Sequence, residues 1–113
     1  MWWLAADDRL SSGAREAIRT AASRVVSAAS VWEVAIKRPL GKLVAPPAFR
    51  QTLEDHGVEL LAISARHAER VGELALHHRD PFDRLLVAQA LEEGLTLVSG
   101  DRALASYGVP LLW

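Results

Sequence analysis

The chain has 113 residues, 50% of them hydrophobic, with no cysteine and a formal net charge of −1. This length and composition fit one domain over residues 1–113 with a core of its own, and they exclude disulfides, thiolate metal sites and a cysteine nucleophile. The near-neutral charge argues against an overall basic surface that holds nucleic acid, and the lack of cysteine fits a cytoplasmic protein. Neither a secretory signal nor a membrane-spanning run is evident in the sequence.

The first third of the chain predicts a helix, a strand and a second helix. Capping serines followed by helix formers predict a helix over residues 12–22, and a β-branched run predicts a strand over residues 24–28. Apolar residues at helical spacing predict the next helix from about Ser30, which Pro39 and Gly41 end.

The middle of the chain repeats this alternation. A helix is predicted from Pro47 to Gly57, followed by a strand over residues 58–63. Ser64 is placed to cap a further helix, and one face of that helix is expected to carry Ala68, Val71, Leu74 and Ala75.

The last third opens with Asp80, which suits an N-cap because Pro81 follows at the first helical position. The helix is expected to run to Gly94, and two strands are predicted over residues 95–98 and 109–113.

Strands that alternate with helices predict an α/β fold, in which a mostly parallel sheet carries helices on both faces. Ligands in such sheets bind beyond the carboxyl ends of the strands. Glu33, Asp80, Asp83 and Asp101 are all expected at that end of the sheet, although they come from distant parts of the sequence. Their convergence predicts a divalent metal site, and oxygen ligands favour Mg²⁺ or Mn²⁺ over zinc.

Most of these acids also have a structural explanation when each is taken alone. Asp80 is most simply a helix cap, Asp83 can complete the same cap, and Asp101 is compatible with a turn. Glu33 is harder to explain in this way because apolar residues surround it. His56 and His67 are expected on polar helix faces and are not candidate ligands.

A local contact with nucleic acid remains open, since basic side chains lie near the acids in the sequence. These residues also have an ordinary reading as surface charge pairs. The candidates are Lys37, Arg38, Lys42, Arg79, Arg84 and Arg102.

Four segments together resemble VapC-type PIN-domain proteins, the ribonuclease toxins of type II toxin–antitoxin pairs. They are SAASVWEVAIK over residues 27–37, HRDPFDRLLVAQA over 78–90, LTLVSGD over 95–101 and YGVP over 107–110. The resemblance covers nearly the whole chain.

The resemblance implies that Glu33, Asp83 and Asp101 are catalytic and bind Mg²⁺ or Mn²⁺, while Asp80 caps a helix and contacts the water shell of the metal. It implies cleavage of RNA by metal-activated water, with Lys37 and Arg84 as candidate substrate-binding residues. It also implies a homodimer that is silenced by a cognate VapB-type antitoxin. Clustered carboxylates cannot all stay ionised without a cation, which agrees with such a site.

The sequence departs from the family at its front. Family members begin with a strand that ends in an Asp and lies in the middle of the sheet, whereas this sequence starts at Met1-Trp2-Trp3. Without that strand, neighbouring strands would keep unpaired backbone groups, each costing about 1–3 kcal/mol, and we expect the chain alone to be unstable. Two explanations stay open: a start codon assigned late, which we favour, or a decayed toxin that only binds its antitoxin.

Overall fold

The structure is a computed structural model, and it describes residues 24–41, 48–75, 80–99 and 102–112. Four sets of predicted features fall outside these ranges: the helix over 12–22, the placement of Asp101, the basic candidates Lys42 and Arg79, and the features at the front of the sequence.

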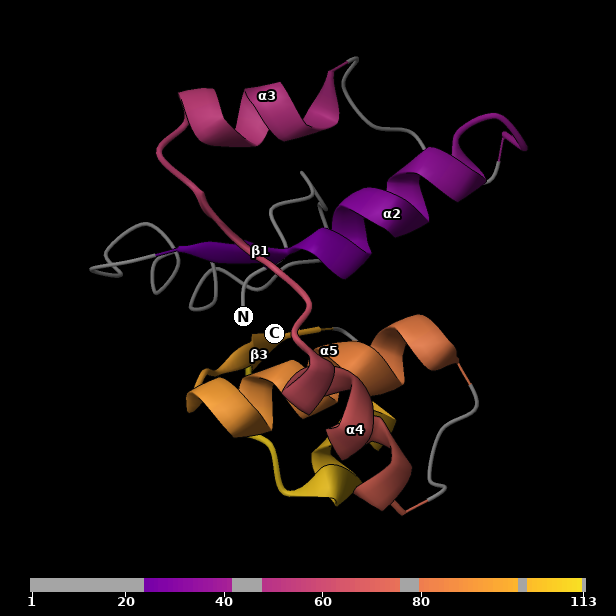
Figure 1. Ribbon diagram of the computed structural model, residues 1–113, viewed down its shortest axis with the longest axis vertical. Coiled ribbons are helices and arrows are strands. Elements are labelled where there is room, and N and C mark those ends of the chain that lie inside the picture. Colours follow the sequence, from indigo (N-terminus) through magenta and orange to yellow (C-terminus); the bar gives the residue numbers. More distant parts are fainter. Residues whose placement is uncertain (1–23, 42–47, 76–79, 100–101, 113) are drawn as a thin grey trace.

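The first half of the described chain is built from β1 (Val25–Ser27), α2 (Ala28–Lys37), α3 (Phe49–Asp55) and β2 (Glu59–Leu61). The strands β1 and β2 are parallel, with Val26 opposite Leu60. Figure 1 shows α2 and α3 together in its upper half. Apolar side chains from these elements bury one another in a cluster formed by Val26, Val34, Phe49, Leu53 and Val58.

The second half is built from α4 (Ala65–Glu73), α5 (Pro81–Glu93), β3 (Leu97–Val98), the 3₁₀ helix η1 (Arg102–Tyr107) and β4 (Leu111–Leu112). These elements occupy the lower half of Figure 1, where α4 packs against α5. A second buried cluster holds them together, and it consists of Val87, Ala90, Leu97, Leu104 and Val109.

The prediction of parallel strands alternating with helices is confirmed, but the prediction of one continuous sheet is not. Within the described ranges the strands form two parallel pairs, β1 with β2 and β3 with β4. No ladder between described strands joins one pair to the other. The two halves instead meet through their helices, since α2 packs against α5.

The start of α2 corrects the sequence prediction. The helix begins at Ala28, because the Ser27 side chain accepts a hydrogen bond from the Ala29 N–H and so acts as the N-cap. Ser30, which was expected to open the helix, lies buried inside it. Glu33 therefore lies in the second turn and not at the helix start.

The capping of α4 by Ser64 is confirmed, but its predicted apolar face is wrong in part. Ala68 is exposed, whereas His67, which was expected on a polar face, is buried with 2% of its surface exposed. His67 is buried because both of its ring nitrogens find partners inside the protein. Its Nδ1 accepts from the Ser64 N–H at 3.0 Å, and its Nε2 lies 2.7 Å from Glu93 Oε1.

Both ends of α5 follow the sequence signals. Asp80 Oδ1 accepts hydrogen bonds from the N–H groups of Phe82 at 2.9 Å and Asp83 at 3.4 Å, which satisfies two donors that the first turn leaves unpaired. Gly94 ends the helix with φ +65°, a left-handed conformation that glycine adopts without a steric penalty.

The cap at Asp80 can be tested apart from any metal. Asp80→Ala removes the capping oxygen and should lower the free energy of unfolding by about 0.5–2 kcal/mol, whereas Asp80→Asn keeps that oxygen and should stay close to the parent. Urea unfolding followed by circular dichroism measures both values. Equal losses in the two variants would show that the negative charge, and not the cap, supplies the stability.

Candidate metal site

Glu33, the first of the predicted metal ligands, lies in the second turn of α2. Its side chain is mostly buried, with 21% of its surface exposed. Lys37 lies one helical turn further along, and its Nζ donates to Glu33 Oε2 at 3.1 Å. The helix therefore presents one carboxylate with a cation already beside it.

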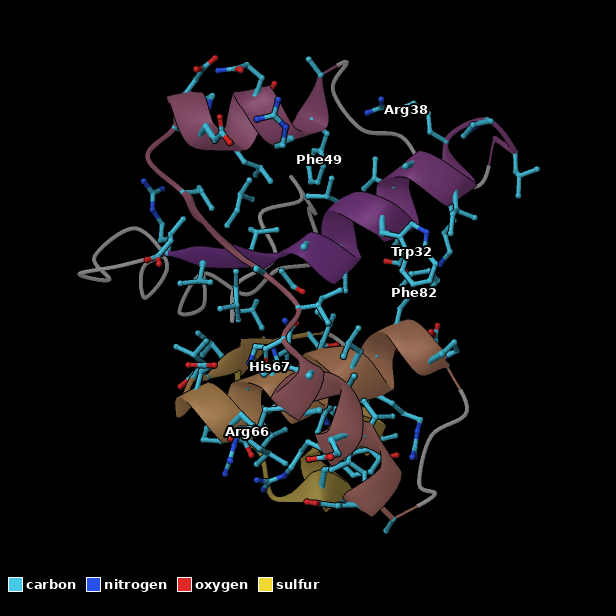
Figure 2. The ribbon with its side chains drawn as sticks, in the orientation of Figure 1. Trp32, Arg38, Phe49, Arg66, His67 and Phe82 are labelled. Carbon is cyan, nitrogen blue, oxygen red and sulfur yellow. The ribbon has the colours of Figure 1, made fainter. Side chains whose placement is uncertain are left out.

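Asp83 reaches the same region from the first turn of α5. Trp32 of α2 and Phe82 of α5 meet edge to face, with ring centroids 5.0 Å apart and ring planes at 62° (Figure 2). Glu33 follows Trp32 in the sequence and Asp83 follows Phe82, so this contact brings the helix segments that carry the two acids together.

Lys37 is influenced by acids from both helices. The hydrogen bond to Glu33 raises the pKa of Lys37 above its usual 10.5, and partial desolvation opposes this rise. The negative charges of Glu33, Asp80 and Asp83 raise the same pKa further. One ammonium group thus feels acids from both helices, and Lys37 is fully charged at neutral pH.

The donor chemistry suits a hard divalent cation, although the described residues do not form a complete cage. Among them no group of three or more His, Cys, Asp or Glu side chains gathers closely enough to hold a metal ion. Magnesium sites commonly use only one or two carboxylates and fill the other positions with water and substrate phosphate. Glu33 and Asp83 fit this pattern, and Asp80 lies beside Asp83 with its Oδ1 engaged in the cap.

Arg84 has a structural contact that the sequence did not indicate. Its guanidinium donates to the carbonyl oxygens of Val71 and Ala75, both at 3.0 Å, and to the Tyr107 hydroxyl at 3.2 Å. The last carbonyls of a helix have no partner within the helix, so Arg84 caps the C-terminal end of α4 from α5. Its role in binding substrate stays a prediction.

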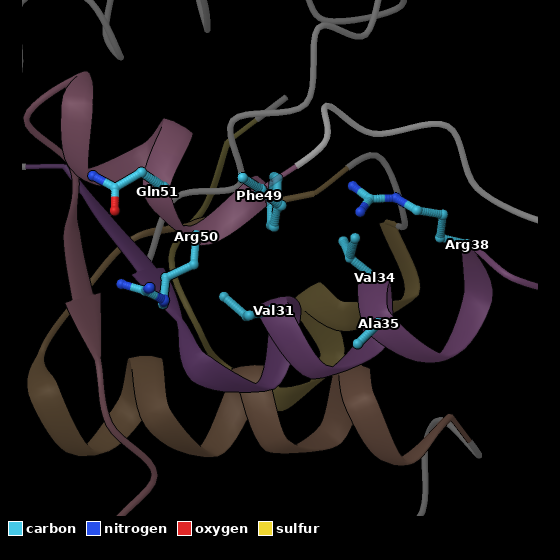
Figure 3. A pocket seen from close by; sticks show the side chains of 8 residues that line it. Val31, Val34, Ala35, Arg38, Phe49, Arg50 and Gln51 are labelled. Carbon is cyan, nitrogen blue, oxygen red and sulfur yellow. The ribbon is translucent and has the colours of Figure 1, made fainter.

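A pocket of about 230 Å³ lies elsewhere, between α2 and α3 (Figure 3). It is lined by Val31, Val34, Ala35, Arg38, Ala48, Phe49, Arg50 and Gln51. Neither Glu33 nor Asp83 contributes to it, because its α2 residues lie on a different face of that helix from Glu33 and Lys37. This hollow is therefore separate from the acidic site.

Comparisons with known proteins identify the family to which the chain belongs. The family model described as "PIN domain" matches residues 1–110. The chain is also similar to the protein named Ribonuclease VapC22 from Mycobacterium tuberculosis, with 34% identity over 112 residues, which cover 96% of this chain and 86% of that protein. Both findings agree with the resemblance in the sequence motifs, and the chain belongs to the PIN-domain family as a homologue of the VapC toxins.

Proposed function

We propose that this protein is a metal-dependent endoribonuclease and the toxin of a type II toxin–antitoxin pair. The observation that carries the proposal is the contact between α2 and α5 at Trp32 and Phe82, the neighbours of Glu33 and Asp83, with the charge of Lys37 beside Glu33. Membership of the PIN-domain family and the similarity to a protein named ribonuclease support the reaction class.

Each residue of the proposed site has a role that follows from its chemistry. Glu33, Asp83 and Asp101 supply oxygen ligands, and Asp80 holds the first turn of α5 through its cap. A bound Mg²⁺ or Mn²⁺ lowers the pKa of water and offsets the charge that builds on the phosphate in the transition state. Lys37 carries a fixed positive charge beside this site, where it can contact an RNA phosphate.

The family also leads us to propose a VapB-type antitoxin, a homodimer and a cytoplasmic location. A protein partner is supported by exposed apolar side chains: Trp32 and Ile36 lie one turn apart on α2 and Leu40 lies in the turn after it, and they are exposed by 56%, 40% and 62%. None of the helices that the structure describes is long and apolar enough to cross a bilayer.

A second candidate function is a catalytically inactive module that binds an antitoxin. It is favoured by one observation, namely that the described residues alone hold no three-carboxylate group. The two functions differ in whether the chain binds a divalent ion.

The catalytic role of the two acids is tested by paired amide substitutions. Glu33→Gln and Asp83→Asn should each lower kcat for RNA cleavage by roughly 10²-fold or more, because each removes a charged ligand. The same substitutions at exposed positions of α3, Glu54→Gln and Asp55→Asn, serve as matched controls and should leave kcat unchanged. Cleavage that persists in EDTA, or that survives Asp83→Asn, would contradict the proposal.

Isothermal titration with Mn²⁺ separates the nuclease from the inactive module. We expect saturable binding by the parent chain and its loss in a Glu33→Gln, Asp83→Asn double variant, because the ion depends on these carboxylates. A parent chain without saturable binding would favour the antitoxin-binding module.

The proposed contact between Lys37 and an RNA phosphate can be tested separately, through the KM for RNA and its salt dependence. Lys37→Gln should raise KM for RNA about tenfold, which corresponds to one lost charged hydrogen bond, while Lys37→Arg should retain most of the affinity. Steady-state kinetics at two salt concentrations measure this, and the salt dependence of KM should weaken in Lys37→Gln. An unchanged KM and salt dependence would rule out the contact.

A further inference from the structure

A buried polar network crosses the interface between α2 and α5, and neither the sequence motifs nor the proposed chemistry assigns it a role. At its centre lies Gln89, whose side chain is fully buried among apolar residues of α5. A buried amide is costly unless its hydrogen bonds are made inside the protein. The partners of Gln89 therefore show what this residue holds together.

The two ends of the Gln89 amide have different partners. Its Oε1 accepts from Ser27 Oγ at 2.5 Å, and Ser27 is itself fully buried. Its Nε2 lies 3.3 Å from His67 Nδ1 and 3.5 Å from the Ala62 carbonyl oxygen. A single side chain of α5 thus reaches the start of α2, the segment after β2, and α4.

His67 makes the network rigid from its far side. Its Nδ1 already accepts from the Ser64 N–H, so this nitrogen carries no proton and also accepts from the Gln89 amide. That choice leaves the proton on Nε2, which donates to Glu93 Oε1. The amide of Gln89 is thereby oriented with its oxygen toward Ser27, because its NH₂ group must face His67. Figure 2 shows His67 near the junction between the two halves of the molecule.

The Ser27–Gln89 hydrogen bond lies at a similar distance along the helix axis from Glu33 on α2 and from Asp83 on α5. Ser27, the N-cap of α2, precedes Glu33 by six positions, and Gln89 follows Asp83 by six positions on α5, which is about 9 Å along each helix axis. The Trp32–Phe82 contact joins the same two helices beside the acids. Two contacts that are separated along the helices fix both the distance and the rotation of α2 against α5, whereas the aromatic contact alone leaves the pair able to pivot.

We propose that Gln89 and Ser27 are positioning residues of the metal site: their buried hydrogen bond holds α2 against α5 so that Glu33 and Asp83 face the same ion. This inference rests on the proposed function, and it adds that the site depends on two buried polar side chains that do not touch the ion. Ser27 is suited to this role because its hydroxyl accepts from the Ala29 N–H while donating to Gln89, so one atom both starts α2 and ties it to α5.

The test compares Mn²⁺ affinity in the full chain with Ser27→Ala, Gln89→Leu and the double variant. Each single substitution should weaken Mn²⁺ binding roughly 3- to 30-fold, a range typical of residues that couple through a network. The double variant should be no weaker than the worse single variant, because both remove the same bond. Effects that multiply in the double variant, or an unchanged affinity in either single variant, would overturn the proposal.

A control separates positioning from a general loss of stability. Val109→Ala removes buried apolar volume from the cluster that also contains Val87 and Ala90 of α5, so it weakens the packing of α5 while both partners of the Ser27–Gln89 hydrogen bond are kept. It should lower the melting temperature as the network variants do, yet leave Mn²⁺ affinity unchanged at temperatures where every variant is folded. A loss of Mn²⁺ affinity in Val109→Ala equal to that in Gln89→Leu would show that the network contributes only to overall stability and does not position the metal site.

A second measurement needs no metal, so a failure of the proposed function is distinguishable from a failure of this inference. The chain has no cysteine, and a Trp32→Cys, Phe82→Cys pair reports the approach of α2 to α5 through its rate of disulfide formation in a glutathione buffer. Adding Gln89→Leu to this pair should slow the disulfide at least about threefold, and adding Val109→Ala should not change it. An unchanged rate with Gln89→Leu would refute the positioning role, whatever the metal titration shows.

Discussion

The packing of α2 against α5 is the constraint on which the site depends. Glu33 belongs to one helix and Asp83 to the other, and the described strands do not join the two halves of the molecule in one sheet. The helices meet instead through the Trp32–Phe82 rings at one point and the Ser27–Gln89 hydrogen bond at another. The position of one carboxylate relative to the other is therefore set by side-chain packing between helices.

The same interface accounts for the electrostatic state of the protein before a metal binds. Carboxylates that approach one another repel, and the repulsion needs a nearby positive charge. Lys37 provides it, since its ammonium donates to Glu33 and also feels Asp80 and Asp83 across the interface. A partly buried pair one helical turn apart contributes little to stability, so its main consequence is to keep a cation beside the acids.

Local signals in the sequence predicted the elements well where one residue type determines the backbone. Asp80 followed by Pro81 marked the start of α5, Ser64 marked the start of α4, and Gly94 marked the end of α5. The start of α2 was misplaced because Ser27 and Ser30 are both capable caps. Ser27 is the cap that also has a buried partner, Gln89, 62 positions away, which no local pattern reveals. His67 was missed for the same reason, because its burial depends on Gln89 and Glu93 in another helix.

The candidate site was only partly predictable. The rule that ligands gather beyond the strand ends, together with the family resemblance, pointed to Glu33 and Asp83, and both lie where α2 meets α5. The contact of Arg84 with the end of α4 could not be predicted, since it depends on how α5 packs against α4. In the sequence, the one sign of the buried network was Gln89, a polar residue within the apolar run of α5. Its role could be inferred only after the structure showed its partners Ser27 and His67.

The most direct test of this account is anomalous diffraction from a crystal of the protein grown with Mn²⁺. We expect one anomalous peak with carboxylate oxygens of both Glu33 and Asp83 within about 2.0–2.6 Å, the range for hard divalent ions. A peak that touches only one of these carboxylates, or a pair of carboxylates too far apart to share an ion, would contradict it.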